Sequence, residues 1–141
     1  MLTGMKHLHS TLAVVLLIAL LLSIIIALVN RAGNKPYNRK IALIGLISAH
    51  LQLLIGVIYY FVMKFPSMIS GSVMKDSVLR FKIIEHPLTM IIAIILITIG
   101  YSKSKKIIDA NKANGTVATY YIIALIFVLL RLPWDTWSLL H

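Results

Sequence analysis

The chain has 141 residues, of which 60% are apolar and only 13% are charged, and it contains no cysteine. An average soluble domain has about 25% charged residues, so an ordinary soluble fold is excluded, as are disulfides, thiolate metal sites and covalently attached c-type haem. The net charge of +10 does not indicate nucleic-acid binding, because the basic residues form short clusters between apolar runs instead of one solvated face. We expect a single membrane domain over residues 1–141.

Four apolar segments follow one another along the chain: residues 12–29, 41–63, 88–101 and 117–132. About 20 helical residues are needed to cross a bilayer. The third segment reaches this length if it starts at Glu85 and His86 with Pro87 in its first turn, and the fourth does so with Trp134 included. The first lacks a convincing cleavage site and is expected to be a retained helix instead of a signal peptide. The predicted fold is an all-α integral membrane protein, a bundle of four transmembrane helices.

The connection between the second and third spans, residues 64–85, has a helical pattern of its own. After the breaker-rich "KFPSMISGS", the segment "SVMKDSVLRFKIIEH" has Met74, Val78 and Phe81 at helical spacing. Ser72 can cap this helix. We predict a short interfacial helix that leads into the third span.

Lysine and arginine cluster in the other two connections, "NRAGNKPYNRK" and "SKSKKIIDANKANG". Because Lys and Arg in short loops stay on the cytoplasmic side, both connections are expected in the cytoplasm. Both termini and residues 64–85 then face the outer side, where Trp134 and Trp137 would form an aromatic belt.

Histidine is the most informative residue type, and none of the five histidines falls in a predicted cytoplasmic connection: His7, His9, His50, His86 and His141. His50 lies about 15 Å beyond Lys40 by helical rise, near the bilayer midplane. An ionisable residue at that depth is expected to face the bundle interior and to have a partner. Counted from the cytoplasmic boundary, His86 lies about 24 Å up, Arg131 about 22 Å and His9 about 31 Å.

Histidines on facing membrane helices are typical axial ligands of b-type haem. We predict His50 and His86 as the iron ligands, although their estimated depths differ by about 9 Å. His9 with His86 is the alternative pair. Arg131, and Arg80 or Lys82, could hold the haem propionates near the outer interface.

The same residues also have structural interpretations. His50 can hydrogen-bond a neighbouring helix, and His86 can be a capping residue at a helix start. His7 and His9 can be ordinary interfacial residues. Arg131 can form a local ion pair with Asp135.

Glu85 has two interpretations: it can accept a hydrogen bond from an imidazole or pair with Arg131. A further possibility, compatible with haem, is an outer quinone pocket lined by Tyr59, Tyr60, Arg131 and Trp134.

Four segments of the chain resemble small bacterial four-helix inner-membrane proteins described as cytochrome b-like: "KHLHSTLA", "SAHLQLLIGVIYYF", "VMKDSVLRFKIIEHPLTMIIAIILITIGYSKSKK" and "RLPWDTW". The resemblance covers most of the chain and implies haem b, electron transfer and the bacterial inner membrane. Because the chain has fewer histidines than two bis-histidine haems would comfortably use, we expect one haem.

We therefore expect an electron-transfer protein or a small subunit of a respiratory membrane complex. The expected partners are the lipid bilayer and other membrane subunits or a second copy of the chain. The alternative is a cofactor-free accessory or assembly subunit whose histidines serve helix packing. No sequence motif assigns an enzymatic reaction.

Overall fold

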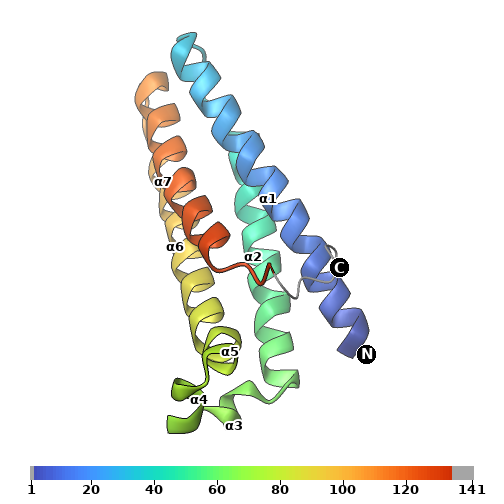
Figure 1. Ribbon diagram of the computed structural model, residues 1–141. Coiled ribbons are helices and arrows are strands. Elements are labelled where there is room, and N and C mark those ends of the chain that lie inside the picture. Colours follow the sequence, from blue (N-terminus) through green and yellow to red (C-terminus); the bar gives the residue numbers. More distant parts are fainter. Residues whose placement is uncertain (1, 135–141) are drawn as a thin grey trace.

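The computed structural model describes residues 2–134, so Asp135, Trp137 and His141 lie outside the described residues. This part of the chain folds into seven α-helices and one π-helical turn (Figure 1). They are α1 (Leu2–Ala32), α2 (Arg39–Val62), α3 (Phe65–Met68), α4 (Gly71–Lys75), α5 (Ser77–Arg80), the π-helical η1 (Phe81–Glu85), α6 (His86–Ser104) and α7 (Ala110–Leu130).

Four helical segments are long and apolar enough to cross a membrane, which confirms the predicted four-helix architecture. Three of them are α1, α2 and α7. The fourth is the continuous run Ser77–Ser104, made of α5, η1 and α6. The third span is therefore longer than the sequence pattern indicated, and His86 lies within it instead of at its start. Pro87 does not end the helix, because the π-helical turn just before it accommodates the proline ring.

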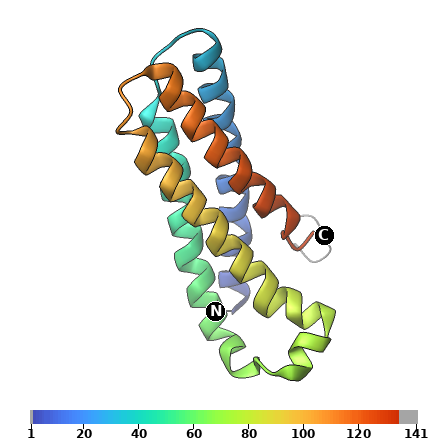
Figure 2. The same ribbon diagram turned by 90° about the vertical axis from the view of Figure 1, so that its left-hand side faces the viewer.

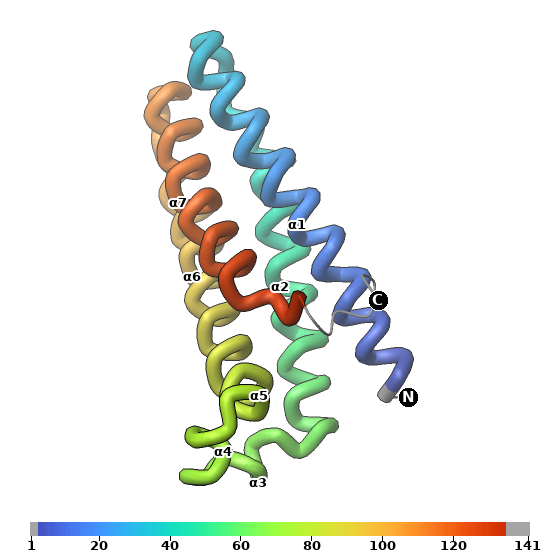
Figure 3. The backbone as a smooth tube through the Cα atoms, viewed as in Figure 1, coloured from blue at the N-terminus to red at the C-terminus, as the bar shows by residue number. Residues whose placement is uncertain are grey.

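The four long helices form a bundle in which each has two main neighbours. α1 packs against α2 and α7, and α6 packs against the same two helices (Figure 3). α1 and α6 are therefore diagonally opposed. Figure 2 shows the two basic connections together at one end of the bundle, and the N-terminal end of α1 lies toward the other end, with the segment that holds α3 to α5. We call these the basic end and the α3–α5 end.

Small residues make up much of the interior of the bundle, and many large aliphatic residues face outwards. Alanine supplies much of the buried core, at positions 13, 19, 27, 42, 49, 93, 113, 118 and 124. Large exposed side chains include Ile18, Ile25, Ile44, Leu54 and Ile126. This distribution is expected for helices that pack closely through small residues while their outer faces meet lipid.

The segment between α2 and α6 is helical, but it is divided into three short helices where one interfacial helix was expected. Asp76 has an extended backbone (ψ 111°) that separates α4 from α5. The Asp76 carboxylate, instead of Ser72, caps α5 by accepting hydrogen bonds from the amides of Val78 and Leu79 at 3.0 and 3.2 Å. The place of this segment at the bilayer surface stays a prediction.

Candidate functional site

Polar and aromatic residues of α1, α2 and α6, and the residue that follows α7, meet toward the α3–α5 end. α1 contributes His9, α2 contributes Gln52 and Tyr59, α6 contributes His86, and Arg131 directly follows α7. We call these five residues the histidine cluster. Their segments are far apart in sequence and converge only through the packing of the bundle.

The His9 and His86 rings lie next to each other across the diagonal of the bundle. Their centroids are 6.3 Å apart and their planes are at 84°. Two imidazoles that share one iron have nitrogens about 4 Å apart, given metal–nitrogen bonds near 2 Å. Each centroid lies about 1 Å behind its nitrogen, so two such rings are about 6 Å apart. The distance between the His9 and His86 centroids is close to this value, and the two rings meet edge to face.

The His86 ring is oriented by the end of α7. Its Nδ1 lies 2.7 Å from the Arg131 carbonyl oxygen. Because a carbonyl only accepts hydrogen bonds, Nδ1 must carry the proton, and Nε2 then has a lone pair. This is the arrangement in which a metal-binding histidine is usually held, with its second nitrogen donating to a backbone carbonyl. The Phe81 ring lies on another side of His86, with centroids 6.0 Å apart.

The His9 ring is held mainly by α2. The Gln52 amide donates to the His9 carbonyl at 2.8 Å, and the Tyr59 ring stacks on His9 with centroids 6.3 Å apart. Gly56 makes room for this packing, because a Cβ added there would lie 3.2 Å from His9 Cε1.

One nitrogen of His9 lacks a hydrogen bond. Within residues 2–134, His9 Nδ1 is buried with no hydrogen-bond partner, and the same is true of Gln52 Oε1. The Gln52 side chain acts on the His9 ring as a hydrogen-bond partner, but from further away than the length of an ordinary hydrogen bond. A buried nitrogen without a partner is uncommon, and a metal ion or a cofactor is one way to satisfy it.

His50 lies elsewhere in the bundle. It is exposed on the outer face of α2 instead of facing the interior, and its Nε2 is 3.0 Å from Thr98 Oγ1. Thr98 follows His86 by twelve residues, which is about 18 Å along α6. Axial ligands must approach to about 4 Å, so the structure brings His86 to His9 and does not bring it to His50.

Charged side chains surround the mouth of the histidine cluster. Glu85 pairs with Arg80, with Nε and Oε2 2.7 Å apart, and more loosely with Arg131, with Nε and Oε1 3.9 Å apart. Glu85 thus bridges the two arginines, and its hydrogen-bond partner is Arg80 instead of an imidazole. Both guanidinium groups are partly exposed. The two arginines and Glu85 together have a net charge of +1.

The residues of the predicted quinone pocket are partly engaged in structural contacts. The Tyr60 hydroxyl donates to the Ile83 carbonyl at 2.9 Å, and Trp134 Nε1 donates to the Leu129 carbonyl at 3.0 Å. Only Tyr59 and Arg131 of that predicted set belong to the histidine cluster.

Two parts of the site were not recognised as such from the sequence. They are Gln52 and Gly56 of α2. Their spacing carried a usable signal, because Gln52, Gly56 and Tyr59 lie at i, i+4 and i+7 on one face of α2. Thr98, the partner of His50, was also missed, since nothing local to either residue relates them.

Comparison with known proteins adds no identification: no family model, no curated protein and no solved structure matches this chain. Within the part of the chain that the structure describes, no three His, Asp or Glu side chains gather to form a metal site by themselves. The cluster offers the His9 and His86 side chains as possible ligands of a metal or cofactor.

Proposed function

We propose that the protein is a membrane-embedded, b-type cytochrome-like electron-transfer protein whose single haem is held by His9 and His86. The observation that carries this proposal is the arrangement of the two rings, 6.3 Å apart on diagonally opposed helices. His50, the partner first expected for His86, is replaced by His9, which the sequence offered as the alternative.

The chain's own residues have distinct parts in this proposal. The Arg131 carbonyl holds the His86 ring so that Nε2 points away from the hydrogen bond. Tyr59 and Gly56 set the orientation of His9 from α2. When bound, haem supplies one-electron redox chemistry. Arg80 and Arg131 offer guanidinium groups to the two propionates.

The test is an absorption spectrum of the purified, dithionite-reduced protein made under haem-replete conditions. We expect b-type α and Soret bands that disappear in His9→Ala and in His86→Ala. His50→Ala is the matched control, because it removes a membrane histidine outside the cluster and should keep both bands. A colourless wild-type protein would overturn the proposal, and loss of the bands in His50→Ala and His86→Ala but not in His9→Ala would restore the pair first predicted.

The second candidate is a cofactor-free accessory or assembly subunit. It is favoured by a different observation: several polar side chains already join helices to one another without any ligand. His86 bonds to the backbone after α7, Gln52 bonds to α1, and His50 bonds to Thr98 on α6. Such contacts stabilise membrane helix packing on their own. This candidate predicts a colourless protein that copurifies with other membrane subunits.

The proposed location is a bacterial inner membrane, with the basic end in the cytoplasm and both termini outside. The support for this orientation is that eight of the fourteen lysines and arginines lie in or beside the two connections at the basic end. We propose that so small a bundle works with other membrane subunits or as a homo-oligomer. Mass measurement of the protein purified in native detergent tests this, and an active monomer would contradict it.

A further inference from the structure

The basic end of the bundle has an open hollow at the connection between α1 and α2. Its volume is about 510 Å³, and residues 30 and 35–40 line it. The lining includes Lys35, Arg39 and Lys40 and contains no acidic residue. The hollow therefore concentrates three positive charges on a surface large enough for a small ligand group.

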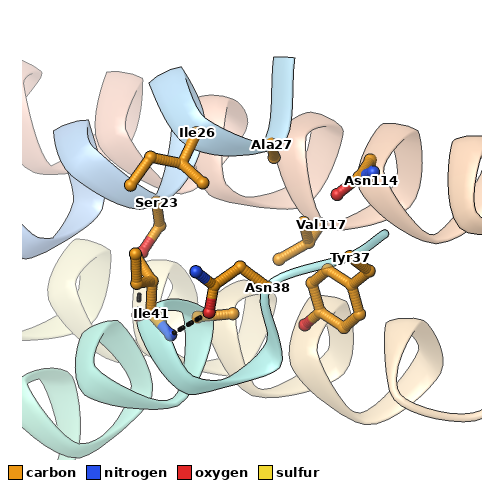
Figure 4. Close-up of a pocket in the computed structure, with 9 residues that line it drawn as sticks. Ser23, Ile26, Ala27, Tyr37, Asn38, Ile41, Asn114 and Val117 are labelled. Carbon is orange, nitrogen blue, oxygen red and sulfur yellow. Dashed lines mark hydrogen bonds between the residues drawn. The ribbon is translucent and has the colours of Figure 1, made fainter. Parts of the chain in front are cut away.

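The backbone around the hollow is held by α7. The fully buried Asn114 donates from Nδ2 to the Lys35 carbonyl at 3.1 Å, and Asn111 donates to the Asn34 side chain at 2.6 Å. Figure 4 shows Asn38 beside this connection, where its side chain accepts from the Ile41 amide at the start of α2. These bonds fix the connection that carries the cations before a ligand arrives, which lowers the entropic cost of binding.

The three cations differ in what else they contact. Arg39 Nε donates to the Tyr101 hydroxyl at 3.0 Å, so the guanidinium is positioned while its terminal nitrogens remain without a partner among residues 2–134. Lys35 and Lys40 are exposed and make no side-chain hydrogen bond or ion pair in the described part of the chain. Burial raises the pKa of Tyr37 to about 12, so this phenol stays neutral and does not offset the positive charge.

We infer that this hollow binds the phosphate head group of an anionic phospholipid. It lies where α1 ends at Ala32 and α2 begins at Arg39, the level at which two apolar spans leave the bilayer. Basic pockets at this level, between membrane helices, recognise anionic head groups. The retention of lysine- and arginine-rich connections in the cytoplasm explains the positive charge of this connection. It does not explain why the connection forms a hollow. The inference is independent of haem.

The test compares two charge-matched double variants in one detergent. The double variant Lys35→Gln/Lys40→Gln removes two cations from the hollow. Neither lysine side chain bonds to another side chain in the described part of the chain. Lys106→Gln with Lys112→Gln removes two exposed cations of the other basic connection. Bound lipid is counted by native mass spectrometry during titration with phosphatidylglycerol, with phosphatidylcholine as the neutral lipid and inorganic phosphate as the free anion.

We expect the wild type and the control to prefer phosphatidylglycerol over phosphatidylcholine. The hollow variant should bind phosphatidylglycerol about 30-fold more weakly, since each Lys near an anionic lipid surface contributes about fivefold in affinity. Both variants should keep the wild-type thermal midpoint in neutral lipid. If the hollow variant unfolds, Lys40→Gln alone provides the comparison, with about a fivefold loss expected.

Three outcomes would overturn the inference. Equal weakening in both variants would assign the effect to general surface charge. The absence of a preference for the anionic lipid would show that there is no site. Displacement of the lipid by an equal concentration of inorganic phosphate would assign the hollow to a soluble anion.

Discussion

Gly100 shows how a single position controls the distance between two helices. A Cβ added to Gly100 would lie 2.5 Å from the Cβ of Tyr120 on α7. That atom is attached directly to the backbone, so Gly100→Ala must push α6 and α7 apart. We expect the variant to lose about 1–3 kcal/mol of unfolding free energy, as overpacked sites do. Reversible unfolding in mixed micelles, followed by circular dichroism, measures the loss.

The control for this prediction is Gly4→Ala. Gly4 lies in α1, and a Cβ added there would meet nothing within 4 Å. Because alanine has the higher helix propensity, this variant should be as stable as the wild type or slightly more stable. Equal stability of the two variants would contradict the close approach of α6 and α7.

The contact between His50 and Thr98 is the second residue-scale feature that can be tested. Thr98 Oγ1 donates to the Ile94 carbonyl at 2.8 Å, so it must accept from His50, whose Nε2 then carries the proton. This is one hydrogen bond between α2 and α6. A double-mutant cycle with His50→Leu and Thr98→Val should give a coupling free energy of about 0.6 kcal/mol, the average for such bonds in a membrane protein. A coupling of zero would show that the bond contributes nothing.

At the scale of an element, a side chain of α2 compensates for the N–H that Pro87 lacks in the third span. Proline has no N–H, so the carbonyl of Ile83, four residues earlier, loses its usual helical donor. The Tyr60 hydroxyl of α2 donates to that carbonyl at 2.9 Å. The donor missing from one helix is thus supplied by another, which lets the third span continue through a proline.

This relation predicts how two substitutions combine. Tyr60→Phe should cost about 1–3 kcal/mol of unfolding free energy, because it leaves the Ile83 carbonyl without this donor. In a Pro87→Ala background the same substitution should cost less, because an amide N–H is again present four residues after Ile83. Thermal unfolding of the four proteins of this cycle measures both costs. Equal costs in the two backgrounds would show that Tyr60 does not replace the missing donor.

At the scale of the whole molecule, the two ends of the bundle differ in charge, and the orientation in the membrane follows from that difference. The chain has no cysteine, so a thiol-reactive label can react only at the single cysteine that a variant introduces. Ile108→Cys lies in a basic connection, where the native side chain is fully exposed (101%), and Val78→Cys lies at the α3–α5 end, where it is 69% exposed. Neither native side chain forms a hydrogen bond or an ion pair.

We expect a membrane-impermeant maleimide applied to intact cells to label Val78→Cys and to leave Ile108→Cys unlabelled until the cytoplasmic side is opened. The physical reason is the retention of lysine- and arginine-rich loops in the cytoplasm. The reverse pattern would invert the proposed orientation.

The membrane architecture was determined by the sequence alone. Run length and hydropathy are local properties, and a bilayer forces each apolar run to satisfy its own backbone hydrogen bonds as a helix. The four spans and the helical character of residues 64–85 therefore agreed with the structure. The helical pattern could not show that Asp76 would divide this region or that Pro87 would sit within a continuous helix.

Only the tertiary structure decided which histidines meet. Depth along a helix can be counted from the sequence, but the direction of a side chain depends on how the helix is rotated against its neighbours. Each residue turns by about 100° around the axis, so His50, directly after the buried Ala49, points outward to Thr98. His9 and His86 lie on helices that are not neighbours, and the packing of α1 and α6 against α2 and α7 brings their rings together across the bundle.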